Sequence, residues 1–337
     1  MDQHIAEAIG RPDLIRLDDR LVCLRFETMK VVSALAAVEH LLATGTVRRG
    51  DTLLDSSSGI YAYALALACH RHDMRCHIVG STTVDHTLRT QLALLGATLE
   101  QMEPCADLKL DQKRRVARIQ EILAEHPDYH WMRQYHDDIH YLGYRAVADR
   151  LREELGASEL LTVVGGVGSG VSTGALARHL REPGGDVRLV GVQPFGSITF
   201  GSEHVADPEI IIAGIGSSIP FGNVHHRQYD VVHWVSFDAA LTGSVDLLRR
   251  HAVFAGLSTG AGHLTARWEH AQDPRRTVVF IAADTGHRYV DSVFARYQGA
   301  APIEDLAPRA ITSRDELGLP WCRMSWDGAE APTAAVA

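Results

Sequence analysis

A glycine-rich segment at residues 165–174, GGVGSGVSTG, contains the residue types that most directly suggest chemistry. It follows an apolar run at 160–166 that predicts a buried strand, and it opens a helical segment at 175–182. Such a turn directs several backbone N–H groups and a helix dipole toward one place, and its hydroxyls add donors. The segment therefore predicts a site for one small anion. Its candidate ligands are Gly166, Gly168, Ser169, Gly170, Ser172 and Thr173.

The G-x-G within this segment also raises two nucleotide-binding alternatives. A dinucleotide fingerprint requires an acidic residue about 20 residues further on, at the end of the next strand. That strand ends here in Gln193-Pro194, and the Walker motif is excluded because the segment has no lysine. A single phosphate monoester is the better fit, and a flexible turn without a ligand is the remaining alternative.

Short β-rich runs alternate with helical segments along the chain, which predicts parallel sheets covered by helices. The expected strands lie at 52–54, 75–80, 160–166, 187–193, 231–236 and 277–283. The expected helices include 29–45, 84–96, 142–156 and 245–256. Ligands bind at the carboxyl ends of parallel strands. Three segments of unusual composition follow such strands, at 55–59, 165–174 and 283–289.

Composition and charge exclude several other classes of protein. At 337 residues and 36.9 kDa the chain is long enough for about two domains. With 42 acidic and 33 basic residues its net charge is −9, which disfavours a nucleic-acid partner. No apolar run approaches the roughly 18 residues of a membrane helix, and the N-terminus lacks a secretion pattern. The five cysteines are odd in number and scattered, so we expect reduced thiols and a cytoplasmic location.

A series of segments in collinear order resembles motifs of the cysteine synthase and cystathionine β-synthase family, whose members use pyridoxal phosphate (PLP). Residues 9–27 resemble the family's opening segment, I-G-x-T-P-L-x-x-L followed by K-x-E, and residues 28–30 resemble S-V-K. Residues 55–62 resemble E-x-T-S-G-N-T-G, 165–174 the G-T-G-G-T phosphate cup, and 191–194 G-V-E-P. Residues 213–216 resemble Q-G-I-G, 256–261 G-I-S-S-G-A, and 284–289 D-[ST]-G-x-R-Y. The resemblance covers roughly residues 8 to 300.

The resemblance implies that Lys30 forms a Schiff base with PLP and then serves as the base at the substrate Cα. It also implies that Ser258 is the hydroxyl partner of the pyridine nitrogen, with Thr259 as the adjacent alternative. A neutral hydroxyl in that position favours loss of a β-leaving group over transamination or racemisation. The implied cofactor is therefore PLP, held by Lys30, Ser258 and the glycine-rich segment.

The resemblance also implies a substrate loop. Residues 57–59 match the family loop that closes on the substrate carboxylate with backbone N–H groups and a hydroxyl. The alternative is a Ser-rich helix cap without a ligand. The implied substrate-binding residues are Ser57, Ser58, Gly59, Tyr61, Gln134 and Gly214.

Several positions depart from the family pattern. Ile60 replaces the asparagine that contacts the cofactor ring, and the pair at 31–32 is Val-Val where the family has Asp-Arg. Gln193 replaces the common glutamate, which suggests a divergent member with an unusual amino acid or nucleophile. His136 and His140 are four residues apart and would suit a metal if helical. The alignment with the family favours a cleft or structural role for both, and no metal is expected.

The implied fold is that of fold-type II PLP enzymes, similar to the tryptophan synthase β subunit: two α/β domains, parallel or mixed sheets covered by helices, and the cofactor between the domains. We expect a larger cofactor-binding domain at 1–38 and 150–323, a smaller mobile substrate-loop domain at 39–149, and a disordered tail at 324–337. Relatives of this type are commonly homodimers, and we expect the same here.

The implied function is β-replacement on a serine- or cysteine-type amino acid through an aminoacrylate intermediate. β-Elimination alone, which releases a keto acid and ammonia, is the nearest alternative. A non-catalytic relative that retains the fold is another, motivated by Ile60 and Val31, and a nicotinamide-dependent dehydrogenase is the last. The expected partner is an amino-acid substrate, without nucleic acid or membrane.

Overall fold

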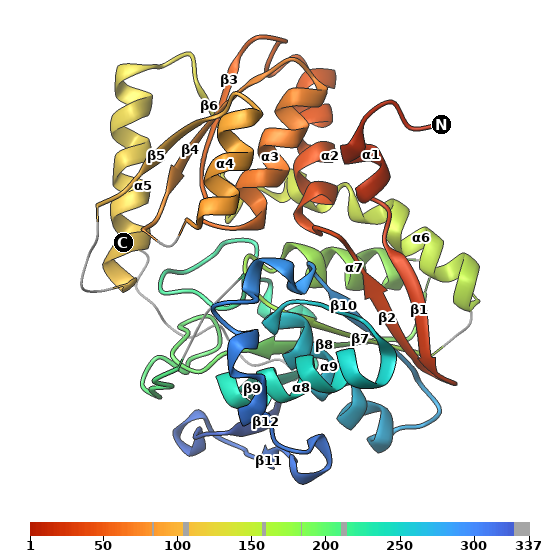
Figure 1. Cartoon of the computed structure of the whole chain (residues 1–337). Helices are drawn as coiled ribbons and strands as arrows, with labels where there is room; N and C mark the ends of the chain where they lie inside the picture. The colour runs from red at the N-terminus through yellow and green to blue at the C-terminus, as the bar shows by residue number, and fades with distance from the viewer. Residues whose placement is uncertain (83, 104–107, 157–159, 183, 210–213, 327–337) are drawn as a thin grey trace. The chain divides into compact units, whose positions relative to one another are not determined.

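The structure is a computed structural model that describes residues 1–326 apart from 83, 104–107, 157–159, 183 and 210–213. It divides into two compact units. The first comprises Met1–Arg11 and Thr28–Gly143, and the second comprises Pro12–Glu27 and Tyr144–Ala337. Figure 1 colours most of the first unit red to yellow and most of the second green to blue.

The first unit is a four-stranded parallel sheet with helices on both faces. Its strands lie in the order β5-β4-β3-β6. They are β3 (Thr52–Ser56), β4 (Arg75–Gly80), β5 (Thr98–Gln101) and β6 (His130–Trp131). The helices are α1 (Ile5–Ile9), α2 (Lys30–Ala43), α3 (Ile60–Arg71), α4 (His86–Leu94), α5 (Leu108–Glu125) and the 3-10 helix η1 (Asp138–Tyr141).

Alternate residues of β3 face the two helical layers. Leu53 packs in one core cluster with side chains of α2, α3 and α4, whereas Leu54 packs against Ile119 and Ile122 of α5. Figure 1 shows α5 on one side of this sheet and α2, α3 and α4 on the other. A parallel strand buried on both faces needs apolar residues at successive positions, which explains why Leu53 and Leu54 are both apolar. The carboxyl end of β3 is therefore fixed by packing from both sides.

The second unit is built on an eight-stranded mixed sheet. Its strands lie in the order β1-β2-β10-β7-β8-β9-β12-β11. They are β1 (Asp13–Asp18), β2 (Leu21–Arg25), β7 (Leu161–Gly166), β8 (Val187–Gln193), β9 (Val231–Val235), β10 (Thr277–Ala282), β11 (Arg309–Ala310) and β12 (Trp321–Ser325). Five of them, from β2 to β9 in this order, are parallel, and β1 and β12 pair antiparallel at either side.

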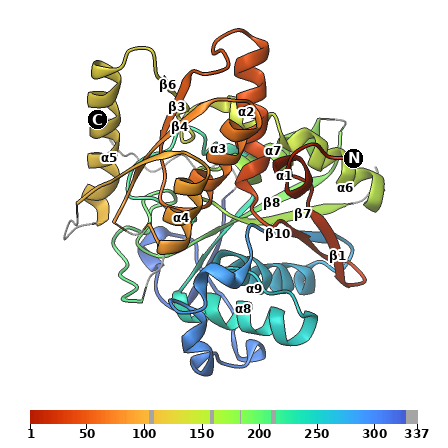
Figure 2. The ribbon, with the colours of Figure 1, turned by 45° about the horizontal axis from the view of Figure 1, so that its top comes forward.

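Helices cover both faces of this sheet as well. The α-helices are α6 (Tyr144–Leu155), α7 (Val171–Arg181), α8 (Phe237–His251) and α9 (Leu257–Gln272). The 3-10 helices are η2 (His226–Gln228), η3 (Gly286–Tyr289), η4 (Phe294–Gly299), η5 (Ile303–Asp305) and η6 (Arg314–Glu316). Figure 2 shows α6 and α7 on one face, with α8 and α9 on the other. None of the described helices is long and apolar enough to cross a membrane.

The predicted α/β class, with parallel and mixed sheets covered by helices, is confirmed. All six predicted strands are present, as β3, β4, β7, β8, β9 and β10. The helix predicted at 245–256 is wrong in its bounds: α8 begins at Phe237 and ends at His251, because Ala252 adopts a left-handed conformation with φ 55°. The apolar residues after it therefore belong to the connection between α8 and α9, where Ala255 forms an isolated β-bridge with Thr285.

The division of the chain differs from the expected domain boundaries. Residues 28–38 belong to the first unit, because Val31, Ala34 and Val38 of α2 are buried in the same core cluster as α3. The expected tail also begins too early. Residues 324 and 325 complete β12, and Trp326 is buried, so only 327–337 are left of it, and these lie outside the described residues.

Candidate active site

The glycine-rich segment forms the predicted strand-to-helix turn of the second unit. β7 ends at Gly166 and α7 begins at Val171, with Gly170 as its N-cap in the left-handed conformation, φ 80°. Gly170 has no side chain with which to cap this helix start. The first N–H groups of a helix have no acceptor within the helix, so those of α7 can bind an anion, as the sequence predicts.

A neighbouring loop, residues 214–216, closes on this turn. A Cβ atom added at Gly168 would overlap the carbonyl oxygen of Gly214, and one at Gly166 would overlap the side chain of Ile215. Gly216 N donates to the carbonyl of Val167 over 2.8 Å. The structure therefore brings the predicted Gly214 directly against the predicted turn, and the turn requires glycine for this packing.

The predicted hydroxyls of the turn differ in their surroundings. Ser169, Ser172 and Thr173 are all buried. Thr173 Oγ1 lies 2.7 Å from the hydroxyl of Tyr229 and 3.3 Å from the carbonyl oxygen of Gly170. The Thr173 hydroxyl thus contacts the backbone of its own turn and Tyr229, and we assign it the role of positioning the turn.

Ser258, on the first turn of α9, lies next to the glycine-rich turn. Its Cβ would be 3.8 Å from a Cβ added at Gly166, and it lines a cavity of about 20 Å³ together with Pro194 and Ile215. The neighbouring Thr259 is fully buried, and its hydroxyl has no hydrogen-bond partner within the described chain. The second unit therefore brings together Gly166, Gly168, Gly214 and Ser258.

A buried carboxyl group lies beside this helix start. A Cβ atom at Gly256, just before α9, would overlap Oδ1 of Asp284, whose Oδ2 accepts a 2.5 Å hydrogen bond from Tyr289. Burial raises the pKa of Asp284 to about 6, against the hydrogen bond from Tyr289, which lowers it. The segment 284–289, which resembles D-[ST]-G-x-R-Y, therefore packs around the helix start that carries Ser258.

Lys30 is the first residue of α2 in the first unit. The following Val31 and Val32 are buried in the core, so the helix start that carries Lys30 is held by apolar packing. Desolvation lowers the pKa of the Lys30 amine from its usual value near 10.5 to about 8. The chain has only two other lysines, Lys109 and Lys113, both within α5. An amine with a lowered pKa is a better nucleophile and base near neutral pH.

The predicted substrate loop follows β3. Ser57 Oγ accepts hydrogen bonds from Ala62 N at 3.1 Å and Gly59 N at 3.4 Å, so it caps the start of α3. Ser58 Oγ accepts from Ser81 N at 2.8 Å. Ser57 thus acts as a helix cap, as the alternative to a substrate-binding loop predicts. It does not exclude substrate binding, because each hydroxyl still has a hydrogen to donate.

A buried polar cluster supports this loop from below. Asp55 accepts hydrogen bonds from Gln134 N at 3.0 Å and Trp131 Nε1 at 3.2 Å, and Gln134 Nε2 donates to Ser56 O at 2.7 Å. Burial raises the pKa of Asp55 to about 6, although these hydrogen bonds oppose the shift. Gln134 therefore lies at the predicted loop, with its amide engaged by the backbone.

Arg115 of α5 is a charged member of this cluster. It is buried, pairs with Asp111 through a 2.8 Å contact, and donates to Ser56 Oγ at 2.5 Å. No sequence motif indicated Arg115, because it lies in a helix rich in charged residues and only the fold places it inside the protein. A buried Arg–Asp ion pair thus lies directly beside Ser56.

Tyr61 and His140 are two further residues of the first unit that bear on the candidate site, and they contact each other. Their rings meet edge to face, with centroids 5.7 Å apart. The Tyr61 hydroxyl is buried and has no partner within the described residues. His140 Nε2 lies 2.9 Å from the carbonyl oxygen of Met132, and Lys30 is one of the charges that lower the pKa of His140, after burial. Across the described chain, no group of three or more His, Cys, Asp or Glu residues suits a metal ion.

Comparison with known proteins identifies the family of the chain and the cofactor that this family uses. The family model described as "Pyridoxal-phosphate dependent enzyme" matches residues 7–284. The chain belongs to this family. The predicted cofactor and the predicted class of enzyme are thereby confirmed, as is the resemblance to fold-type II enzymes.

Two curated relatives of this PLP-dependent enzyme carry the same name, N-(2-amino-2-carboxyethyl)-L-glutamate synthase. The one from Ralstonia nicotianae is 31% identical over 264 residues, which are 76% of this chain and 75% of the relative. The one from Cupriavidus metallidurans is 29% identical over 314 residues, 86% of this chain and 89% of the relative. The solved O-acetylserine-dependent cystathionine β-synthase of Helicobacter pylori has a TM-score of 0.75 at 21% identity, covering 86% of this chain and 98% of its own, which shows the fold.

The described residues fit PLP. The α7 start and the glycine backbone suit a phosphate group, and the partly desolvated amine of Lys30 suits an imine-forming lysine. The buried, unpartnered hydroxyl of Thr259, next to Ser258, is a polar atom that the protein itself leaves unsatisfied. Ile60, the first residue of α3, remains the clearest departure, because it offers no polar contact to a cofactor ring.

Proposed function

We propose that this PLP-dependent enzyme is a synthase that replaces the β-substituent of a serine- or cysteine-type amino acid by the amino group of a second, acidic amino acid. The observation that carries this proposal is the 31% identity to an N-(2-amino-2-carboxyethyl)-L-glutamate synthase over 76% of the chain. That name describes a glutamate whose nitrogen bears the β-carbon of an alanyl unit. Such a product arises when an amine replaces a β-substituent.

The proposed division of roles assigns each predicted residue one task. When bound, PLP withdraws electrons from the Cα of an attached amino acid, so that its proton and then its β-group can leave. Lys30 holds the cofactor covalently and exchanges the Cα proton through Nζ, because its pKa of about 8 lets the amine change protonation state near neutral pH. The glycine-rich turn binds the phosphate, and Ser258 contacts the ring nitrogen as a neutral hydroxyl.

The proposed substrate residues of the first unit lie at the carboxyl end of β3. The hydroxyls of Ser57 and Ser58 and the backbone N–H of Ser58 bind the substrate carboxylate, since an anion is stabilised at the start of α3. The N–H groups of Ser57 and Gly59 already donate within the protein, to Val79 O and Ser57 Oγ. The full set is Ser57, Ser58, Gly59, Tyr61, Gln134 and Gly214. Arg115 supports an acidic second substrate, because its guanidinium has further N–H donors for a carboxylate besides those that bind Asp111 and Ser56.

Incubation of the PLP-loaded protein with O-acetyl-L-serine, L-serine or L-cysteine, each with and without L-glutamate, tests the proposal. We expect a carbon–nitrogen-linked product by mass spectrometry only when glutamate is present. Release of pyruvate and ammonia at the same rate with or without glutamate would indicate β-elimination instead. If none of the three donors is consumed while the protein binds PLP, the synthase assignment is wrong.

The expected homodimer and cytoplasmic location stay predictions. Light scattering of the purified protein, at several concentrations, measures the oligomeric state. Four of the five cysteines, Cys23, Cys69, Cys76 and Cys322, are buried free thiols in the described chain, which suits a reducing compartment.

A further inference from the structure

The second unit has a polar pocket at the edge of its sheet opposite the glycine-rich turn. Its volume is about 230 Å³. The lining residues are Asp186, Val187, Arg188, Asp230, Arg276 and Ser325. They lie at one end of four strands: Asp186, Val187 and Arg188 at the start of β8, Asp230 just before β9, Arg276 just before β10, and Ser325 at the end of the antiparallel β12. Because β8 spans the seven residues Val187–Gln193, the pocket lies about 20 Å from the carboxyl end where the turn is.

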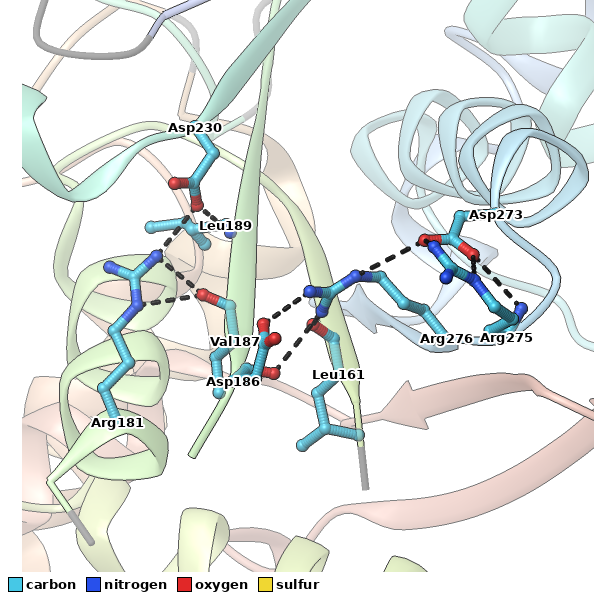
Figure 3. Close-up of polar contacts among 9 residues, drawn as sticks. All are labelled: Leu161, Arg181, Asp186, Val187, Leu189, Asp230, Asp273, Arg275 and Arg276. Atoms are coloured by element: carbon cyan, nitrogen blue, oxygen red, sulfur yellow. Dashed lines mark hydrogen bonds and ion pairs between the residues drawn. The ribbon is translucent and has the colours of Figure 1, made fainter. Parts of the chain in front are cut away.

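Two arginines hold residues of this pocket in place: Arg276, which lines it, and Arg181, which binds the lining residue Asp230. Figure 3 shows their polar contacts. Arg276 donates to the carbonyl of Leu161 at 2.8 Å and binds Oδ1 of Asp186. Arg181 donates to the carbonyl of Val187 and to Oδ2 of Asp230, both at 2.8 Å. These contacts tie strand starts together and fix the two carboxylates in place.

These arginine contacts leave polar groups of the lining available to a ligand. Each carboxylate uses one oxygen, so Asp186 Oδ2 and Asp230 Oδ1 have no partner within the described residues. Arg188 has one ion-pair partner in the described chain, Glu269 Oε2, which its Nη1 meets at 3.3 Å. A guanidinium has five N–H donors, so Arg188 retains donors for another group. Its side chain is 29% exposed, which leaves it reachable.

We infer that this pocket is a second binding site, for a free α-amino acid, distinct from the site where PLP acts. A simple anion would meet two carboxylates there, and a simple cation would meet Arg188 and Arg276. A zwitterion satisfies both signs: its carboxylate binds the guanidinium of Arg188, and its ammonium binds the free oxygens of Asp186 and Asp230. The volume admits a small molecule only. This inference does not depend on the proposed function.

The test separates the two sites by their signals. The twenty common amino acids are screened one by one with the PLP-loaded protein, by calorimetry and by the visible absorbance of the cofactor. Binding at the cofactor changes the absorbance, whereas binding in the pocket gives heat without that change. We expect at least one amino acid to bind with heat alone, and its 2-hydroxy and decarboxylated analogues to bind at least about tenfold more weakly, a loss of about 1.4 kcal/mol or more.

Variants then locate the heat signal. Asp186→Asn removes the charge but keeps an oxygen for Arg276, and its side chain is 60% exposed, so the fold should persist. Asp149→Asn is the matched control: Asp149 is 51% exposed and also pairs with an arginine, Arg152. We expect about tenfold weaker heat-only binding for Asp186→Asn, no change for Asp149→Asn, and an unchanged absorbance titration for both.

Three results would overturn the inference. They are the absence of heat-only binding for all twenty amino acids, equal binding by Asp186→Asn and Asp149→Asn, and tighter binding of inorganic phosphate than of any amino acid. If Asp186→Asn is unstable, Arg188→Gln serves instead. Its amide retains a donor for Glu269 but loses the guanidinium, so unchanged binding by this variant would count equally against an amino-acid site.

Discussion

At the scale of single residues, Lys30 combines two properties that a surface lysine lacks. It is fixed at a helix start by a buried Val-Val pair, and desolvation lowers its pKa to about 8. Its amine is therefore largely neutral above pH 8, and only the neutral form attacks an aldehyde. We expect the rate of PLP incorporation into cofactor-free protein to rise with pH and level off just above pH 8.

Borohydride trapping followed by peptide mapping measures this rate and its site. The chain has three lysines, so the label has few possible positions, and the exposed Lys113 is the internal reference. A pyridoxyl label on Lys113 rather than Lys30, or a rate that still climbs steeply above pH 10, would remove Lys30 from the proposed mechanism.

Arg115 leads to a second residue-scale prediction. Its guanidinium beside Ser56 is proposed to bind the carboxylate of an acidic nucleophile. Arg115→Lys retains the charge but loses the planar fork that binds both Asp111 and Ser56. We expect KM for L-glutamate to rise about tenfold, with kcat changed by less than about twofold.

The control for Arg115 is a neutral nucleophile. KM for an uncharged amino acid should change little in Arg115→Lys, because the lost contact concerns a carboxylate. Equal increases in KM for acidic and neutral nucleophiles would indicate a general distortion of the loop. Thermal unfolding of the variant separates that outcome from a loss of stability.

The sequence anticipated single residues only where a motif carried them. Lys30, the glycine-rich turn and Ser258 each stand in a recognisable segment, and the fold gathers Gly166, Gly168, Gly214 and Ser258 at one sheet edge. Arg115 and the buried Asp55 network were missed, because each depends on contacts between residues 59 to 79 positions apart. No local pattern reports such contacts.

At the scale of elements, the glycine-rich turn depends on backbone contacts that leave no room for a side chain. Gly168→Ala would force a Cβ into the carbonyl oxygen of Gly214, so the turn and the neighbouring loop must separate. We expect PLP affinity to fall at least about tenfold. Gly262→Ala within α9 is the matched control, since its nearest contact would be an ordinary 3.8 Å.

Spectroscopic PLP titration of both variants measures the effect. Gly262→Ala should bind PLP normally, with stability within about 1 kcal/mol of the parent protein. If Gly168→Ala also binds PLP normally, the turn is not the phosphate site.

A second element-scale feature is the buried network that joins β9, β12 and α9. Glu269 accepts hydrogen bonds from His233 at 3.0 Å and Arg323 at 2.7 Å, and Trp321 Nε1 donates to the other ring nitrogen of His233. Because indole only donates, His233 is neutral with its proton on Nε2. Burial alone would raise the pKa of Glu269, but its partners bring it down to about 2.

This shift predicts a window of acid sensitivity. The unfolded chain binds the Glu269 proton near pH 4.5, the folded protein only near pH 2, so stability from this group is complete above pH 4.5 and is lost toward pH 2. We expect Glu269→Gln to lower the stability at pH 7 by about 3 kcal/mol and to flatten the slope within the window. Urea midpoints at pH 7 and pH 3 test this, with the exposed Glu153→Gln as control; identical slopes for both variants would contradict it.

Elements were predictable to the extent that their signals are local. The six apolar strand segments were found because a parallel strand buried on both faces is continuously apolar. The strands β6 and β11 were not predicted, because a segment of two residues is too short to show an alternation of apolar and polar side chains. The start of α8 was missed because Phe237–Ser244 is almost entirely buried and lacks the polar face that marks an amphipathic helix.

At the scale of the whole molecule, two compact units each carry part of the proposed cofactor machinery, Lys30 in the first and the glycine-rich turn in the second. Assignment of residues 28–38 to the first unit could not be read from the sequence, because it depends on which helices α2 packs against. The proposal that one PLP molecule engages both groups makes cofactor binding a property of the entire chain.

Removal of the cofactor should therefore destabilise the protein as a whole. A ligand that binds only the native state adds about 2.7 kcal/mol at a free concentration one hundred times its Kd. We expect PLP to raise the Tm of the parent protein and of Lys113→Ala equally, because Lys113 is exposed. Lys30→Ala should show a smaller rise that needs more PLP, since only the phosphate contacts remain. Equal rises for Lys30→Ala and Lys113→Ala at every PLP concentration would mean that the lysine and the turn do not serve the same ligand.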